Sequence, residues 1–97
     1  AVRGDWAAAA AYADQALAFG PLPGTDALLG AVFVEAYAHA GRWQDAWALA
    51  EQMRARNPYM VQSYCRLWQR IERETPASPE RQDVLAQAYL VNDCPVP

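Results

Sequence analysis

The sequence predicts an all-α protein of about five helices, arranged as antiparallel helical hairpins. Three observations favour this class. Ala, a strong helix former, is the most frequent residue, whereas the β-branched residue Ile occurs only at Ile71. Gly and Pro divide the chain into segments that each suit one helix. A pattern of eighteen residues also occurs twice, and the 97 residues suit a single small domain over 1–97.

The repeated pattern covers residues 4–21, GDWAAAAAYADQALAFGP, and residues 41–58, GRWQDAWALAEQMRARNP. The offset is 37 residues, and eight of the eighteen positions are identical, including the Gly, the Trp and the closing Pro. A period of this length is typical of stacked helical hairpins. In each copy the Gly can end the preceding helix, because it tolerates a left-handed conformation. The Pro ends the helix of its own copy, because it disfavours helical angles in the residue before it.

These signals predict helices over residues 5–19, 26–40, 42–57, 59–74 and 79–92. The first and third helices are the two copies of the pattern, and each has a face of small residues that lets a neighbouring helix approach closely. The second helix can be capped by Thr25 or Asp26, and its apolar residues follow the spacing of an amphipathic helix.

The last two helices have their own start signals. Asn57 can cap the fourth helix, with Pro58 at its first position. The fifth helix follows Ser78-Pro79-Glu80, which supplies a cap, a proline and an acidic residue in series. It ends at Asn92-Asp93, where a turn is expected.

The residues of the central hairpin resemble the tetratricopeptide repeat (TPR) family. That family pairs a large apolar residue, a small residue and Tyr on one helix with Gly, an aromatic residue, Ala and Pro on the next. The matching residues are Phe33, Tyr37, Gly41, Trp43, Ala46 and Pro58. The resemblance is clearest over residues 4–58 and implies a short right-handed solenoid. Two departures concern size: Gly30 stands where a large residue is usual, and Met53 where Ala is expected.

The TPR resemblance implies a concave groove, lined by the first helix of each hairpin, that binds a peptide or protein segment. The helix over 79–92 resembles a first helix, so the groove would be shared between it and the helix over 26–40. The matching positions are Leu28, Ala31, Glu35, Ala38, His39, Glu80, Asp83, Gln87 and Leu90. Because these positions carry carboxylates, we expect a neutral or basic partner, not an acidic one.

The expected function is therefore a non-catalytic interaction or scaffold module. The alternative is a sensor or regulatory helical-repeat region of a larger bacterial transcriptional regulator or signalling protein. The helix over 5–19 lacks its usual partner, so we also expect its apolar face to be covered by other parts of a longer protein or by self-association.

Composition argues against several other classes. The formal net charge is −3, whereas a nucleic-acid-binding domain normally has a basic face. Apolar runs such as residues 27–34 are too short to span a bilayer. The chain begins at Ala1 instead of Met, and we expect it to be a fragment of a longer protein. We expect a soluble protein, with the cytoplasm favoured unless Cys65 and Cys94 are bonded, in which case the periplasm fits.

The residues that could carry chemistry are few. His39 lies near a helix end, where the helix dipole favours histidine, and no nucleophile stands at a recognisable spacing from it. His39, Cys65 and Cys94 are too scattered for a typical zinc site. We therefore predict no catalytic residue, metal or cofactor. Cys65 and Cys94 fit either a disulfide across the last hairpin or two buried thiols, and Trp47 fits core packing better than an exposed anchor.

Overall fold

The computed structural model describes residues 5–19 and 27–94, and the side chains of all of these except residues 27–29. The described part of the chain is all-helical and contains no strand. Each helix begins and ends within two residues of its expected bounds. The five helices are α1 (Trp6–Ala18), α2 (Ala27–His39), α3 (Trp43–Arg56), α4 (Val61–Glu74) and α5 (Pro79–Val91). Gly4, Pro21, Thr25 and Asp26, which carried expected stop and cap signals, lie outside the described residues.

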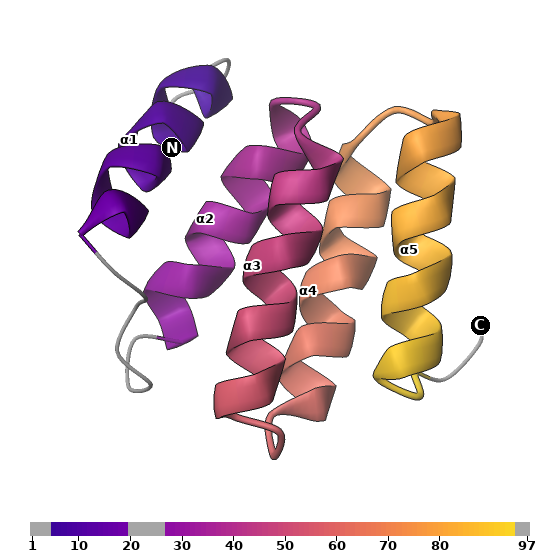
Figure 1. The fold of residues 1–97 in the computed structure, drawn as a ribbon. Helices are drawn as coiled ribbons and strands as arrows, with labels where there is room; N and C mark the ends of the chain where they lie inside the picture. The colour runs from indigo at the N-terminus through magenta and orange to yellow at the C-terminus, as the bar shows by residue number, and fades with distance from the viewer. Residues whose placement is uncertain (1–4, 20–26, 95–97) are drawn as a thin grey trace.

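The helices lie side by side from α1 at one edge to α5 at the other (Figure 1). Helix α2 packs against α1, α3 and α4, and α5 packs against α3 and α4. The core runs through all five helices, and its largest fully buried side chains are Val34, Trp68 and Ile71. Helix α4, and not α5, therefore lies beside α2. This differs from the expected sharing of a groove between α2 and α5, because the apolar side of α4 enters the core next to α2.

Two small residues let α1 approach α2 closely. Ala10 and Ala13 are buried in this contact. Ala13 belongs to the predicted small-residue face, with the half-buried Ala9 and Ala16, whereas Ala10 was expected to lie beside that face. Polar side chains reinforce it, since both carboxylate oxygens of Asp14 accept hydrogen bonds from the Arg42 guanidinium, at 2.7 and 3.0 Å. Tyr37 Oη donates to Asp14 Oδ1 at 2.8 Å. The bonds from Arg42, and secondarily from Tyr37, hold the pKa of Asp14 below its ordinary value.

Gly30 is smaller and Met53 is larger than the residues expected at these positions, and the two residues meet at one contact. A Cβ atom on Gly30 of α2 would lie 2.8 Å from Met53 Sδ of α3. The thioether therefore fills the space that a larger residue at position 30 would need. The two departures from the TPR pattern compensate at one contact between α2 and α3.

The turn between α3 and α4 differs from the expectation. Asn57 ends α3 as its C-cap, and α4 begins at Val61, so Pro58 does not occupy the first position of α4. The reason is a tight turn, in which the Met60 N–H donates to the Asn57 carbonyl at 3.3 Å. Tyr64 Oη lies 3.0 Å from the carbonyl oxygens of both Met53 and Asn57, so it can satisfy the C-terminal end of α3.

Other turn signals are confirmed. Gly41 has a φ of 81°, in the left-handed region, at the end of α2. Ser78 caps α5 by accepting a hydrogen bond from the Arg81 N–H at 3.1 Å, with Pro79 at the first helical position. Asp93 ends α5 with a φ of 52°.

Cys65 and Cys94 form a disulfide. It ties the segment after α5 to the first half of α4, so the hairpin of α4 and α5 is a covalently closed unit. Trp47 of α3 is half-buried and packs at a ring-centroid distance of 6.2 Å from Trp68 of α4. This contact agrees with the prediction that Trp47 fills the space before the next helix.

Candidate functional site

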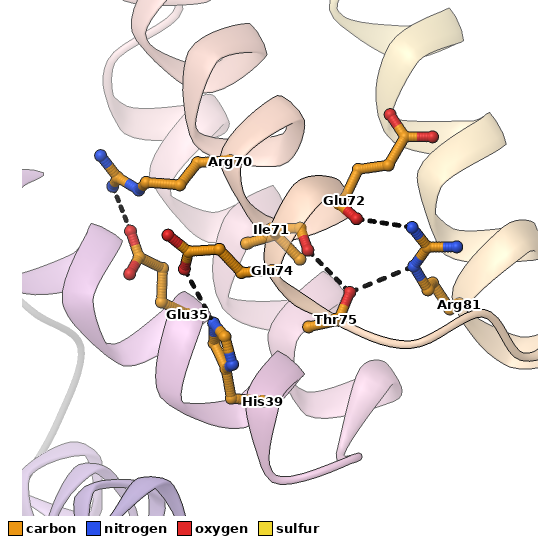
Figure 2. A network of polar contacts seen from close by, with 8 residues as sticks. All are labelled: Glu35, His39, Arg70, Ile71, Glu72, Glu74, Thr75 and Arg81. Carbon is orange, nitrogen blue, oxygen red and sulfur yellow. Dashed lines mark hydrogen bonds and ion pairs between the residues drawn. The ribbon is translucent and has the colours of Figure 1, made fainter. Parts of the chain in front are cut away.

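The candidate site begins with two polar contacts that join α2 to α4 (Figure 2). Arg70 of α4 donates to Glu35 of α2, and His39 Nε2 lies 3.2 Å from Glu74 Oε1. We call the surface formed by these four side chains the α2–α4 face. Glu35 and His39 are largely buried in it, with side-chain exposures of 14% and 10%. Glu35 and His39, two of the predicted groove residues, are therefore in contact with α4.

His39 also contacts α1. Its imidazole stacks on the Trp6 indole with a centroid distance of 4.0 Å and an interplanar angle of 10°. One side chain at the end of α2 thus contacts α1 through its ring face and α4 through a ring nitrogen. This arrangement fixes the orientation of the ring and accounts for His39 as a residue that holds helices together.

A buried arginine fixes the loop between α4 and α5 (Figure 2). Arg81 is only 7% exposed, and it donates to the Glu72 carbonyl at 2.6 Å and to Thr75 Oγ1 at 3.1 Å. Thr75 Oγ1 in turn donates to the Ile71 carbonyl at 2.6 Å. Because these bonds satisfy the last carbonyls of α4, they set where the loop leaves the helix.

Tyr89 of α5 completes this polar cluster. Its Oη donates to Glu72 Oε1 at 2.6 Å. Burial, and secondarily the bond to Glu72, raises the pKa of the Tyr89 phenol. The hydroxyl therefore stays protonated and acts as a donor that holds α5 against α4.

A hollow of about 570 Å³ lies next to this loop. We call it the loop hollow. Its walls come from the end of α2, the turn at Gly41, the start of α3 and the loop after α4. The lining residues are Ala38, His39, Gly41, Trp43, Thr75, Pro76, Ser78, Pro79 and Glu80. Most of these side chains are apolar or small, and the walls are set by the Gly41 turn and by the bonds of Thr75 and Arg81.

The loop hollow brings together three of the predicted groove residues: Ala38, His39 and Glu80. Glu80 is exposed and forms no ion pair with any described residue. Asp83, Gln87 and Leu90 are exposed on α5 but do not line this hollow. Ala31 is half-buried on α2, and the side chain of Leu28 is outside the described part of the structure.

Sequence reasoning missed Arg70, Glu74 and Arg81. The first two reach their partners on α2 across 35 positions of sequence, so no local pattern indicates the pairs. The position of Arg81 gives a weak indication of its role. It stands three residues after the Ser78 cap, and a long side chain at that position can reach back to the preceding helix.

The described residues contain no group of three or more side chains placed to hold a metal ion. No described helix is both long and apolar enough to cross a membrane. The sequence matches no protein-family model, and neither a curated protein nor a solved structure resembles it significantly. The arguments about function therefore rest on the geometry of this chain.

Proposed function

We propose that this chain is a non-catalytic interaction module whose loop hollow receives part of a peptide or protein segment. The observation that carries the proposal is the convergence of Ala38, His39 and Glu80 on one hollow, although they lie on two helices and are 42 positions apart at most. Trp43, Pro76 and Pro79 add rigid apolar surface to the same walls. Apolar walls with a few polar groups at the rim are typical of binding sites.

The order of helix contacts also supports this function. Helix α2 packs against α3 and α4, and α3 packs against α5, so two of the three pairs of helices that lie two apart in sequence are neighbours, whereas α1 packs against α2 and makes at most a weak contact with α3. This order is the one expected of hairpins stacked in series as a TPR-like solenoid, in which α2 and α4 would line the same side. Such an arrangement presents one elongated surface to an extended partner.

The charges favour a partner that is neutral or basic. The Glu35 carboxylate is already paired with the Arg70 guanidinium, and the Glu74 carboxylate lies against His39 Nε2. Glu80 is the acidic residue of the hollow that has no charged partner among the described residues. A Lys or Arg beside an apolar residue in the partner would complement it.

The experiment uses peptides selected from a random display library on the immobilised protein, followed by titration of the isotope-labelled protein. We expect the selected peptides to carry no net negative charge and to shift the amide signals of Ala38, Gly41 and Glu80. The Glu80→Lys variant should bind them about five to tenfold more weakly. Asp83→Lys is the matched control, because Asp83 lies one turn further along the exposed side of α5 and does not line the hollow.

Three outcomes would contradict the proposal. These are selection of acidic peptides, chemical-shift changes that map away from the loop hollow, and equal loss of affinity in the two variants. Glu35→Lys is a poorer probe than the sequence indicates, because it would also break the contact with Arg70.

Self-association through α1 is a second proposal, supported by two exposed aromatic side chains. Tyr12 is 63% exposed and Phe19 94% exposed, whereas Ala10 and Ala13 are covered by α2. Sedimentation of the wild type against the double variant Tyr12→Ser, Phe19→Ser tests it, and a wild-type monomer at all concentrations would exclude it. The Cys65–Cys94 bond supports an oxidising compartment for the chain, such as the periplasm.

A further inference from the structure

Helix α1 lies at one edge of the molecule and packs against α2 (Figure 1). Ala10 and Ala13 are buried in that contact, and the residues on the other side of the helix are exposed. We call this exposed side the outer face of α1, which is formed by Ala8, Ala11, Tyr12, Gln15, Ala18 and Phe19. The face carries no charge, because the charged residue of α1 is Asp14, whose carboxylate is turned to Arg42 and Tyr37.

Residues 41–58, the second occurrence of the repeated pattern, show how the same face is built where it meets solvent. Asp45 and Arg56 stand 37 positions after Ala8 and Phe19, and both are exposed on α3. Helix α3 thus carries charged side chains at exposed positions where α1 carries a methyl group and an aromatic ring. An exposed face that has large apolar side chains and no charge is typical of a surface that another molecule covers.

Tyr12 shows the same contrast. Its counterpart in α3 is Leu49, which is 3% exposed, whereas Tyr12 is 63% exposed. The Tyr12 ring also contacts Phe33 of α2, at a centroid distance of 6.1 Å. This contact orients the ring on the outer face before a partner arrives, which lowers the entropic cost of binding.

Four residues of the outer face lie on one line along the helix. They are Ala8, Tyr12, Gln15 and Phe19, with successive spacings of four, three and four residues. These spacings are those of the a and d positions of a coiled coil, where two helices interlock. We call these four residues the seam. Ala11 and Ala18 lie beside the seam and let a second helix approach closely, so the outer face is suited to a helical partner.

The seam is complementary to itself when a second copy of α1 runs antiparallel to it. A two-fold axis between Tyr12 and Gln15 places Ala8 of each molecule opposite Phe19 of the other, and Tyr12 opposite Gln15. The smallest side chain of the seam then meets an aromatic ring. The Tyr12 hydroxyl meets an amide with which it can form a hydrogen bond.

A parallel arrangement fits less well. It would place Phe19 opposite Phe19 and Ala8 opposite Ala8, so one end of the seam would be crowded and the other would enclose a gap. It would also align the two helix dipoles in the same direction, whereas opposite helix ends meet in the antiparallel pair.

The absence of charge favours a second molecule of this chain over a charged peptide. Where two identical surfaces meet around a two-fold axis, a charged residue near the axis lies close to its own copy and is repelled. The outer face avoids this repulsion, although the chain as a whole has a formal net charge of −3. A charged partner, in contrast, would find no complementary group on this face.

We propose that the outer face of α1 binds the same face of a second molecule, with the two helices antiparallel around a two-fold axis between Tyr12 and Gln15. The inference rests on the self-association through α1 proposed above, and it adds the partner surface and the register. A single pair of helices lies at the low end of interface sizes, below about 1,200 Å², so the dimer is weak and reversible, with a Kd of about 10–1,000 µM.

The test is sedimentation equilibrium of the disulfide-bonded protein at concentrations from about 10 µM to about 1 mM, where we expect a monomer–dimer equilibrium. Ala8→Asp and Phe19→Arg introduce the residues that α3 carries at the equivalent exposed positions, so both variants should fold, which circular dichroism checks. Each should weaken the dimer about tenfold or more. Tyr59→Arg is the matched control, because it replaces a 96% exposed aromatic residue outside α1 by the same charge, and it should dimerise like the wild type.

The double variant Ala8→Asp, Phe19→Arg tests the register. In the antiparallel pair the new carboxylate at position 8 lies opposite the new guanidinium at position 19 of the other molecule, twice per dimer. The double variant should therefore dimerise about three- to tenfold more tightly than the two single effects combined would give. Within one molecule the two positions are about 16 Å apart along the helix, too far for a direct ion pair. In a parallel pair each new charge would lie opposite its own copy, and no such recovery would occur.

The outcomes separate this inference from the proposal on which it rests. A wild type that stays monomeric at all concentrations would overturn the self-association through α1 and this inference with it. The same holds if the single variants dimerise like the wild type, or if Tyr59→Arg weakens the dimer as much as Phe19→Arg. A dimer that the single variants weaken and the double variant does not recover would overturn the antiparallel register alone.

Discussion

The contact between Gly30 and Met53 gives a quantitative test of how α2 packs on α3. The change is Gly30→Ala, whose Cβ would lie 2.8, 3.2 and 3.3 Å from Sδ, Cε and Cγ of Met53. Ala stabilises a helix interior by about 1 kcal/mol relative to Gly. Against this, moving the buried Met53 side chain, which is 8% exposed, costs about 1–3 kcal/mol. We therefore expect Gly30→Ala to lower the free energy of unfolding by up to about 2 kcal/mol.

The same change should have the opposite sign when Met53 is shortened. In a Met53→Ala background the three close atoms are gone, so Gly30→Ala should raise the free energy of unfolding by about 1 kcal/mol. Urea unfolding of the wild type, both single variants and the double variant, followed by far-ultraviolet circular dichroism, measures the coupling. Met53→Ala alone should cost about 2–5 kcal/mol, and Met53→Val replaces it if the protein unfolds. A coupling below about 0.5 kcal/mol would refute the packing argument.

Three further predictions follow from other contacts. Replacing Cys65 and Cys94 by Ala opens a loop with a sequence separation of 29, which should lower the free energy of unfolding by about 3.6 kcal/mol, and an unchanged urea midpoint would contradict this. Arg81→Met should destabilise by about 3 kcal/mol, because the Glu72 carbonyl and Thr75 lose a buried donor, and hydrogen exchange should accelerate first in the loop after α4. Because the folded pKa of Asp14 lies below its ordinary value of 3.8, the stability that its carboxylate contributes is complete above pH 3.8 and is lost as the pH falls through the lowered pKa. Hydrogen exchange of α1 at decreasing pH measures that loss, and Asp14→Asn should remove the pH dependence.

The helices could be predicted from the sequence because residues at or next to each helix end determine where that helix begins or stops. Position 41 requires a positive φ, which Gly adopts readily. The N-cap of α5 requires a side-chain acceptor, which Ser78 supplies, and the first position of α5 needs no N–H donor, so Pro79 fits there. Each of these requirements is local to one helix turn. The same local reasoning was wrong at Asn57 and Pro58. At this point the chain forms a turn before α4 begins, and Tyr64 Oη donates a hydrogen bond to the Asn57 carbonyl in that turn.

The candidate site could be predicted only in part, because its residues depend on which helices become neighbours. Ala38, His39 and Glu80 do meet at one hollow. Glu35 was expected to face a ligand, yet it pairs with Arg70, since α4 and not α5 lies beside α2.

The disulfide also determines what a cut in the backbone would do. Cys65 lies before the loop that follows α4, and Cys94 lies after α5. A protease that cleaves between Thr75 and Ser78 would therefore not release the C-terminal fragment. The two pieces would migrate as one species in gel electrophoresis until a thiol reagent separates them.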